Sequence, residues 1–366
     1  MFSLKDKQLA REIVTKIKVQ EISLKFMHVC GTHQDTLVKH GLDVLLRECG
    51  IEIGQGPGCP VCVTTPREIE EMLLFARKGK TVTTFGDMVN VPGEKYSLQS
   101  MRTEGYDVRT VYGIEDAVSI AEKNKEKDVV FMAIGFETTA PTTASVLLKN
   151  LPGNFSILNC HRTIPPALKA ILDMGEIKVD GLIEPGHVST VIGTKPYEFI
   201  SKDYHVPQVV TGFEPLDLLM GVWMLVEQIE HGMATVQNEY TRAVHEEGNV
   251  KAQKVIDEVF EPGDKKWRGF PVIPKSSLEL RSGFDVYDAR KNFEDELEEL
   301  RDKEFKEPDG CRCGELLRGL LSPQECPLFG VKCTPDSPVG PCMVSIEGSC
   351  NIEYRYAKKR SRHPTK

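Results

Sequence analysis

Six cysteines are crowded into the last 56 residues of the chain, in a segment that is rich in proline and poor in hydrophobic periodicity. Thiolates hold metal centres in segments that cannot build a core, so this cluster predicts an inorganic centre. An iron–sulfur centre is one interpretation. Structural zinc, despite the lack of paired Cys-x2-Cys knuckles, and structural disulfides are the others. The six residues are Cys311, Cys313, Cys326, Cys333, Cys342 and Cys350.

A seventh cysteine, Cys30, follows an apolar run and precedes a glycine, which predicts a strand that delivers it to the start of a helix. The positive end of a helix and the imidazoles of His28 and His33 would favour its thiolate form. A soft thiolate with histidine in reach is a metal ligand or a nucleophile. An inert cysteine in a strand-end turn is the alternative.

Cys59 and Cys62 form a Cys-x2-Cys motif in a rigid turn of glycine and proline. That spacing can close a redox disulfide, as in thioredoxin-like proteins, or supply half of a metal site. No second Cys-x2-Cys exists in the chain, so we favour a redox dithiol. Cys49 and Cys160 have the surroundings of ordinary packing residues.

Weaker candidates stand at the ends of other predicted strands. Glu137 could supply an acid to a cleft, although a helix-capping segment explains it almost equally well. His187 follows Pro185-Gly186 at a strand end, where a lone histidine is more often structural. No phosphate-binding loop occurs, so nucleotide binding has no motif behind it.

Length and composition limit the domain number and the class of protein to which these residues belong. A chain of 366 residues predicts two or three domains, and a net charge of −8 gives no basic footprint for nucleic acid. The first residues have no apolar run of the length that a signal peptide needs, and about 18 consecutive apolar residues occur nowhere. We therefore expect a cytoplasmic protein with no membrane contact.

Short apolar runs alternate with amphipathic stretches over the first two-thirds of the chain, which predicts parallel strands with helices between them. Ligands of such sheets collect outside the carboxyl ends of the strands, so the functional groups should converge on one rim. A run of mixed charge over residues 290–307 is typical of an exposed helix or linker. The predicted strands are 24–29, 81–84, 108–111, 129–134, 156–159, 181–183 and 208–210. The predicted helices are 32–47, 66–77, 114–123, 142–148, 165–174 and 215–231.

Seven segments, in order along the chain, together resemble the HypD family of [NiFe]-hydrogenase maturation proteins, and the resemblance runs from about residue 24 to residue 356. They are Val29-Cys30-Gly31-Thr32-His33, Gly56-Pro57-Gly58-Cys59-Pro60-Val61-Cys62-Val63, Thr84-Phe85-Gly86-Asp87, Gly135-Phe136-Glu137-Thr138-Thr139, Pro185-Gly186-His187-Val188-Ser189, Gly212-Phe213-Glu214-Pro215-Leu216-Asp217 and Cys326-Pro327-Leu328-Phe329-Gly330.

The resemblance implies an α/β protein with two α/β domains whose mainly parallel sheets face a cleft, and a small irregular, partly helical C-terminal domain that holds a [4Fe–4S] cluster. We place the domains at residues 1–115, 116–265 and 266–366. The implied function is a scaffold and redox protein for assembly of the Fe(CN)2CO unit of [NiFe]-hydrogenase. The implied partners are a HypC-type chaperone and a HypE-type cyanide donor, which acts with HypF.

The resemblance also implies roles for single residues. Cys30 would hold the iron together with a cysteine of the chaperone, and Cys59 and Cys62 would be the dithiol through which electrons from the cluster arrive. His28 or His33 would hydrogen-bond cyanide or tune Cys30. The implied cluster ligands are Cys313, Cys326, Cys333 and Cys350, which leaves Cys311 and Cys342 as a further dithiol. Candidate cleft residues are His28, Glu137, His187 and Glu214.

Two other functions fit the same residues. A thiol–disulfide oxidoreductase would use a cluster with Cys59 and Cys62 to reduce a protein substrate, and its Cys30 would bind no iron. A zinc-binding adaptor would use the C-terminal cysteines structurally. Three positions depart from the family pattern: Asp35 where some members have histidine, Glu184 where a smaller or thiol residue is often found, and Ser277 at a usual glycine.

Overall fold

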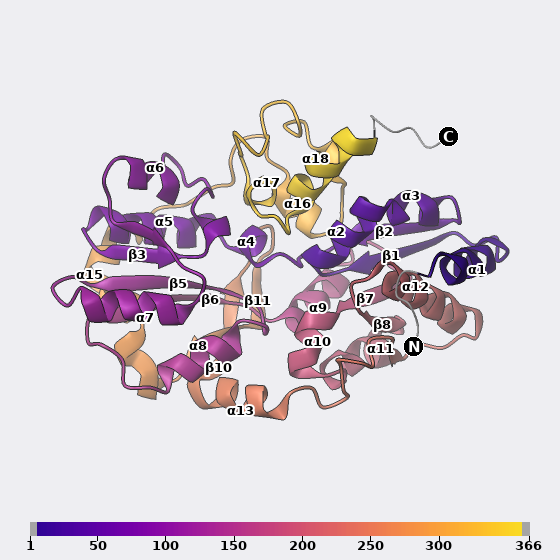
Figure 1. Ribbon diagram of the computed structural model, residues 1–366, viewed down its shortest axis with the longest axis horizontal. Helices are drawn as coiled ribbons and strands as arrows, with labels where there is room; N and C mark the ends of the chain where they lie inside the picture. The colour runs from indigo at the N-terminus through magenta and orange to yellow at the C-terminus, as the bar shows by residue number, and fades with distance from the viewer. Residues whose placement is uncertain (1–5, 361–366) are drawn as a thin grey trace.

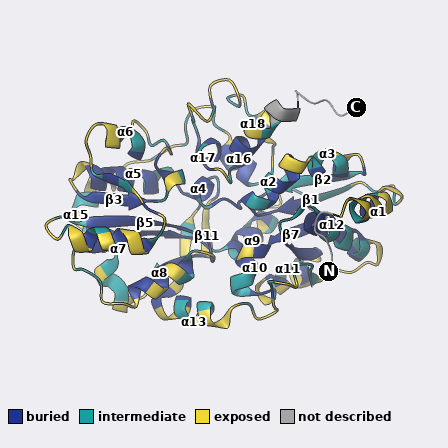
Figure 2. Ribbon diagram, viewed as in Figure 1, coloured by how far each residue is buried: buried dark blue, intermediate teal, exposed yellow. Residues whose placement is uncertain are grey.

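The computed structural model describes residues 6–360, with side chains as far as residue 356. Two α/β lobes lie side by side, and the cysteine-rich segment sits over the junction between them (Figure 1). Buried residues concentrate in the strands and near the junction, while the peripheral helices expose one face (Figure 2). The predicted α/β class with two mainly parallel sheets is confirmed.

The first lobe is a parallel sheet with the strand order β2-β1-β7-β8-β9. Its strands are β1 (Leu24–His28), β2 (Ile51–Gln55), β7 (Gly181–Pro185), β8 (Gln208–Thr211) and β9 (Val236–Asn238). Its helices are α1 (Lys7–Lys18), α2 (Gly31–His40), α3 (Leu42–Arg47), α10 (Gly186–Ile192), the 3-10 turn η2 (Lys195–Tyr197), α11 (Glu198–Tyr204) and α12 (Pro215–Glu230).

The second lobe contains a parallel sheet with the order β4-β3-β5-β6 and a separate antiparallel hairpin of β10 and β11. Strand β5 is buried along its whole length, as expected of an apolar run in the middle of a parallel sheet. The strands are β3 (Thr81–Thr84), β4 (Val108–Thr110), β5 (Val129–Gly135), β6 (Phe155–His161), β10 (Phe260–Lys266) and β11 (Val272–Leu280). The helices are α5 (Pro66–Arg77), η1 (Gly86–Met88), α6 (Leu98–Thr103), α7 (Ile114–Lys123), α8 (Ala140–Leu147) and α13 (Val250–Val259).

Three connections cross between the lobes. Helix α4 (Pro60–Val63) leads from β2 into the second lobe, and α9 (Ile164–Met174) leads from β6 back to the first. Residues 239–249 lead from β9 of the first lobe to α13 of the second. One sheet contains β3, β4, β5 and β6, so it spans the predicted boundary near residue 115. Each lobe combines segments that are far apart in the sequence, and local periodicity contains no information on such pairing.

The C-terminal third begins on the second lobe and ends over the junction. Residues 266–300 pack on β6 and α5, so the thiol-rich segment starts later than the predicted boundary at 266. Arg290 forms an ion pair with Glu71, and Lys80 forms one with Glu296, which fixes this predicted linker to the lobe. Its elements are η3 (Ser282–Tyr287), α14 (Ala289–Asn292), α15 (Glu294–Leu297) and η4 (Glu298–Leu300), followed by α16 (Cys313–Leu317), η5 (Pro323–Glu325), α17 (Pro341–Val344) and α18 (Ser349–Arg360).

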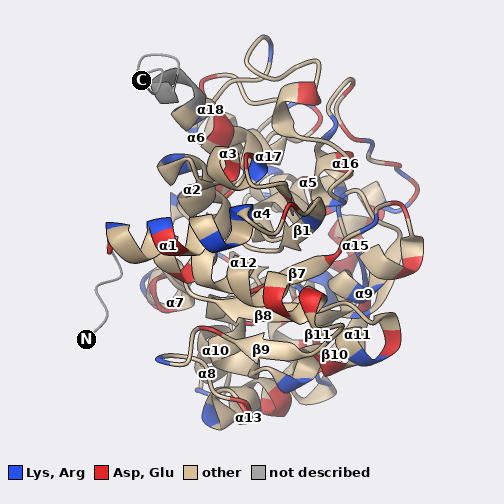
Figure 3. Ribbon diagram, turned by 90° about the vertical axis from the view of Figure 1, so that its right-hand side faces the viewer, with Lys and Arg blue, Asp and Glu red and all other residues tan. Residues whose placement is uncertain are grey.

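Local sequence accounts for most of the helix ends. The predicted helix over residues 32–47 is divided in two at Gly41, whose φ of 69° only glycine adopts without strain. Helix α12 starts at Pro215, where the missing N–H would have no partner in any case. Acidic and basic side chains are interspersed along the elements seen in Figure 3. No helix within residues 6–360 has the length and hydropathy that a membrane span requires.

A buried ion pair holds the second lobe together and predicts acid sensitivity. The Glu68 carboxylate caps α5 and accepts a hydrogen bond of 2.6 Å from Arg162. Burial alone would raise the pKa of Glu68, but Arg162 and its cationic neighbours lower it to about 2. The carboxylate therefore stabilises the fold at pH values above 4.5, the ordinary pKa of a glutamate. This contribution is lost as the pH falls from 4.5 towards 2.

We expect Glu68→Gln to lower the free energy of unfolding at pH 7 by about 3 kcal/mol. Urea unfolding at several pH values checks this: the difference from the wild type should shrink as the pH falls below about 4.5. A difference that stays constant down to pH 2 would contradict the assignment.

Candidate metal and thiol site

The carboxyl end of β1 and the turn that carries the Cys-x2-Cys motif are packed against each other. Gly56 N–H donates to the His28 carbonyl at 2.8 Å, and Gly31 N–H donates to the Gly58 carbonyl at 3.3 Å. A Cβ at Gly58 would overlap the backbone of Val29 and Cys30. The structure thus places Cys30 directly beside the turn that presents Cys59.

Cys59 and Cys62 are joined by a disulfide at the start of α4. Neither residue has any exposed surface, and the Cys62 amide donates to Cys59 Sγ at 3.2 Å. Helix α4 packs against α16 and α17, the two helices that carry Cys313 and Cys342. The motif therefore connects the Cys30 site with the thiol-rich segment in space.

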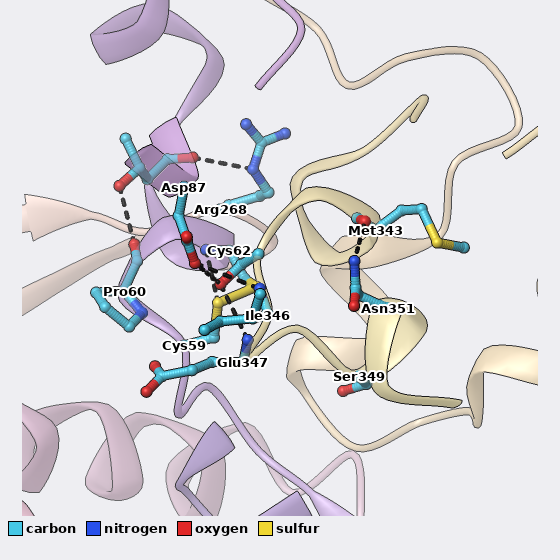
Figure 4. The surroundings of a disulfide bond; sticks show 12 residues. Cys59, Pro60, Cys62, Asp87, Arg268, Met343, Ile346, Glu347, Ser349 and Asn351 are labelled. Carbon is cyan, nitrogen blue, oxygen red and sulfur yellow. Dashed lines mark hydrogen bonds between the residues drawn. A yellow bond between two sulfur atoms is a disulfide. The ribbon is translucent and has the colours of Figure 1, made fainter. Parts of the chain in front are cut away.

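Residues 345–349 cover this site and contact both lobes. Ser345 Oγ and the Ile346 amide donate to Asp87, at the end of β3, at 3.1 and 3.3 Å. Ser349 donates to Gln55 of the first lobe, and a Cβ at Gly31 would lie 2.6 Å from the Glu347 carbonyl oxygen. Figure 4 shows Asp87, Ile346 and Glu347 around the disulfide. The predicted cleft is thus closed over the sulfur atoms.

Cys30 is protonated in this environment, contrary to the expectation of a favoured thiolate. The residue is 7% exposed, and burial raises the pKa of its thiol to about 11. The amides of His33 and Thr32 at the helix start lower this pKa only in part, and the nearby Glu347 carboxylate raises it. A stable Cys30 thiolate would need a cation beside it. The neighbouring imidazoles do not supply one, because burial keeps them neutral as well.

His28 and His33 flank Cys30 as neutral rings. Burial lowers the pKa of His28 to about 4 and that of His33 to about 3. His28 Nε2 lies 2.8 Å from Gln34 Oε1, and its Nδ1 accepts from the Cys30 amide at 3.4 Å. His33 Nε2 lies 3.0 Å from the Gly212 carbonyl, which can only accept, so Nε2 bears the proton and the buried Nδ1 has no partner. Both N–H groups are thus engaged within the protein.

The remaining predicted cleft residues differ in their surroundings. His187 is exposed and stacks on Phe213 at a ring-centroid distance of 3.8 Å, and Phe213 also contacts His33 at 5.0 Å. Glu214 caps the N-terminus of α12, so its side chain has a structural partner. Glu137 is buried and accepts from the Ile164 amide at 2.9 Å through one oxygen, while its other oxygen has no partner.

An acid and a tyrosine to which the sequence analysis gave no role, Glu184 and Tyr197, lie near this site together with the predicted Glu137. Glu184 of β7 has no exposed surface, and neither of its carboxyl oxygens has a hydrogen-bond partner. Burial raises the pKa of Glu184 to about 8 and that of Glu137 to about 7. Burial, followed by the charges of Glu184, Glu137 and Cys30, raises the pKa of Tyr197. These groups therefore share one interior region between the lobes.

The unpaired carboxyl predicts that the protein loses stability as the pH rises. An unfolded glutamate ionises near 4.5, whereas folded Glu184 holds its proton to about pH 8, so stability falls between these values. We expect Glu184→Gln to raise the free energy of unfolding at pH 7 by about 3 kcal/mol. Urea unfolding between pH 5 and pH 9 measures this, with the exposed Glu198→Gln as the control. An unchanged pH dependence in Glu184→Gln would contradict the prediction.

Five of the six C-terminal cysteines line one small pocket, together with apolar side chains such as Leu316 and Phe329. The Val339 amide donates to Cys333 Sγ at 3.3 Å, and a Cβ at Gly340 would lie 2.6 and 2.7 Å from the sulfur atoms of Cys311 and Cys313. Sulfur donors with an amide hydrogen bond and an apolar wall suit a metal centre. The five cysteines are Cys311, Cys313, Cys326, Cys333 and Cys350.

Cys342 lies beside this pocket and interacts with Cys313. Cys311 also interacts with Cys313, and its charge acts on Cys342 as well. Among the described residues, no three cysteine, histidine or acidic side chains converge closely enough to hold a single ion. The cysteine-rich pocket is consistent with a metal site.

Sequence reasoning missed Asp87, Glu184, Tyr197 and Glu347 as site residues. The strand-end rule did point to the segment of Asp87, which follows β3, but it assigned no role to this side chain. Tyr197 and Glu347 stand in segments with no comparable signal, and only the packing of distant segments brings them to the site.

The fold and the site together define a thiol-rich α/β protein. A buried cysteine, a disulfide and a cysteine cluster lie one after another in space at the junction of its two lobes. The family model HypD, described as "Hydrogenase formation hypA family", matches residues 5–357. A putative hydrogenase expression/formation protein of Methanocaldococcus jannaschii is 48% identical over 98% of this chain and 100% of its own length. Hydrogenase maturation factors HypD of Rhizobium leguminosarum and Escherichia coli are 41% and 42% identical, over 97% and 93% of this chain and 94% and 91% of their own lengths. The chain belongs to the HypD family and has the role of a hydrogenase maturation factor.

Proposed function

We propose that this maturation factor is the scaffold on which the Fe(CN)2CO unit of a [NiFe]-hydrogenase is assembled, with Cys30 as the ligand of its iron. One observation carries this proposal: Cys30 is a free thiol at the carboxyl end of a central strand, packed against the disulfide turn and covered by Glu347. A buried thiol among polar groups has no role in hydrocarbon packing. The iron unit is cargo, which the protein releases when assembly is complete.

Cys30 can hold iron only after it loses its proton. Metal binding displaces the proton of a thiol, and the positive charge of the iron stabilises the buried thiolate that burial alone disfavours. A single ligand from this chain leaves other iron positions for cyanide, carbon monoxide and a second thiolate. We assign that second thiolate to a HypC-type chaperone, and the cyanide to a HypE-type donor that acts with HypF.

His28 and His33 position Cys30 in this proposal. His28 holds the Cys30 amide, and His33 joins the start of α2 to the end of β8. Because their N–H groups already have partners, this arrangement offers neither as a donor to cyanide, and it supports the tuning role over direct cyanide binding. Both rings fix the direction in which the Cys30 sulfur points.

We propose that the C-terminal pocket holds a [4Fe–4S] cluster, with Cys326, Cys333 and Cys350 as three of its ligands. The family resemblance favours Cys313 as the fourth. Cys311 is the other candidate, because it lines the same pocket and interacts with Cys313. When bound, such a cluster would store and supply single electrons.

Cys59 and Cys62 form the redox dithiol of the proposed assembly. Disulfides are rare in a reducing cytoplasm unless they are catalytic or redox-sensing, and we place this protein there. The alternative is a thiol–disulfide oxidoreductase that acts on another protein. Both sulfur atoms lack exposed surface, so a protein substrate could reach them only after the cover of residues 345–349 opens. This burial favours an internal role.

The experiment is to purify the protein anaerobically with its HypC-type chaperone and to measure the iron carried by the complex in excess of the cluster. We expect Cys30→Ala to reduce this iron to background, because the ligand from this chain is lost. Cys49→Ala is the matched control, since Cys49 is a buried free cysteine of the same lobe that packs in another hydrophobic cluster.

Disulfide reductase activity measured on the same variants separates the two functions. Cys30→Ala with normal excess iron and normal reductase activity would support the oxidoreductase instead.

A further inference from the structure

A group of buried polar side chains near Cys30 has no part in the proposed function. Glu184 comes from β7, Glu137 follows β5, and Tyr197 and Ser189 come from the segment after β7. Tyr197 Oη and Ser189 Oγ are 3.2 Å apart, and Ser189 Oγ donates to the Pro185 carbonyl at 2.9 Å. The group therefore joins the interiors of both lobes.

Glu184 differs from the structural acids of this protein. Glu68 is equally buried, but it has Arg162 as a partner and caps a helix. For Glu184, burial is the cause of the raised pKa, and both carboxyl oxygens are unpartnered. A buried carboxyl without a partner costs stability, so packing gives no reason for its presence.

The position of Glu184 connects it to the thiol site. Strand β7 pairs with β1 in a register that aligns Ile183 with His28, so Glu184 stands one residue closer to the end of β1, where Cys30 begins the turn. The phenol of Tyr197 senses the charges of Glu184, Glu137 and Cys30 together.

We propose that Glu184, assisted by Glu137, balances the charge of the metal cargo: it gives up its proton when a cation binds at Cys30 and regains one when anionic ligands are added to the metal. This inference rests on the proposed function. A divalent cation brings two positive charges into a buried site, and the Cys30 thiolate neutralises one. Ionisation of Glu184 neutralises the other, so that the S–H and O–H bonds break, one metal–sulfur bond forms and two protons leave to solvent.

The cadmium ion alone is the probe, because this soft divalent cation binds thiolates without redox chemistry. Calorimetric titration of the cluster-containing protein in buffers of different ionisation enthalpy counts the protons released per cation. Subtraction of the Cys30→Ala titration isolates the Cys30 site. At pH 7 we expect the wild type to release more than the single thiol proton, and Glu184→Gln to release up to about one proton fewer. Glu184→Asp should restore the release, and the exposed Glu198→Gln should leave it unchanged.

Infrared difference spectra supply a second measurement. The carbonyl stretch of a protonated carboxyl should disappear when cadmium binds to the wild type, and this change should be absent in Glu184→Gln. Equal proton release and equal spectra in the wild type and Glu184→Gln would overturn the inference and leave the proposed function intact. Titrations of the wild type and Cys30→Ala that do not differ would instead contradict the metal-binding role of Cys30, and the inference with it.

Discussion

We expect each of three single substitutions to remove the visible iron–sulfur absorption and the cluster iron. They are Cys326→Ser, Cys333→Ser and Cys350→Ser. These sulfur atoms line one pocket from three separate chain segments, so each substitution removes one ligand of the proposed cluster. The pocket has too small a core of its own to keep its shape without the centre, so we also expect residues 311–350 to become sensitive to protease. The measurement is the absorption spectrum with iron and sulfide analysis of anaerobically purified variants.

Cys49→Ser and Cys160→Ser are the controls for this prediction, because both are buried free cysteines outside the pocket. Serine at Cys311 and at Cys313, tested separately, identifies the fourth ligand. Retention of the full absorption in any one of the Cys326, Cys333 and Cys350 variants would contradict the proposed ligand set. Zinc in place of iron in the purified wild type would contradict the proposal of an iron–sulfur cluster itself.

Gly58→Ala should abolish iron loading although it leaves every cysteine in place. A Cβ at Gly58 would overlap the backbone of Val29 and Cys30, which cannot move aside as a flexible side chain could. The turn must then separate from β1, and Cys30 loses its fixed distance from Cys59. Overpacking of this kind costs about 1–3 kcal/mol of stability, so the variant should still fold.

Gly54→Ala is the matched control, because a Cβ at Gly54, four residues earlier, would have its nearest neighbour at 3.8 Å. Excess iron in the chaperone complex and the urea-unfolding midpoint are measured for both variants. Loss of iron in Gly58→Ala alone would show that the packing of the turn on Cys30 is required. Normal iron in Gly58→Ala would mean that the site does not depend on this contact.

Local features of the chain predict most of the elements. All seven predicted strands exist, and the predicted helices over residues 66–77 and 114–123 match α5 and α7. Strand β2 escaped notice because its five residues include a glutamate, a glycine and a glutamine. The grouping of strands could not be predicted, because β7 pairs with β1 across more than one hundred residues and nothing in either strand specifies its partner.

The same distinction applies to the site. Cys30, Cys59 and Cys62 stand out because their types and spacing carry chemistry, and the structure brings their segments together. The protonation of Cys30 could not be predicted, because it depends on burial under residues 345–349, which are more than three hundred residues away. Glu184 stands at a strand end, where a charged residue is normally solvated, and only the folded chain shows that it is buried without a partner.

Infrared spectroscopy of the protein purified anaerobically with its HypC-type chaperone tests most directly whether Cys30 holds the iron unit. We predict stretching bands of coordinated cyanide and carbon monoxide in the wild-type complex, and their absence in an equally pure complex of Cys30→Ala. Bands of unchanged intensity in the Cys30→Ala complex would contradict this role of Cys30.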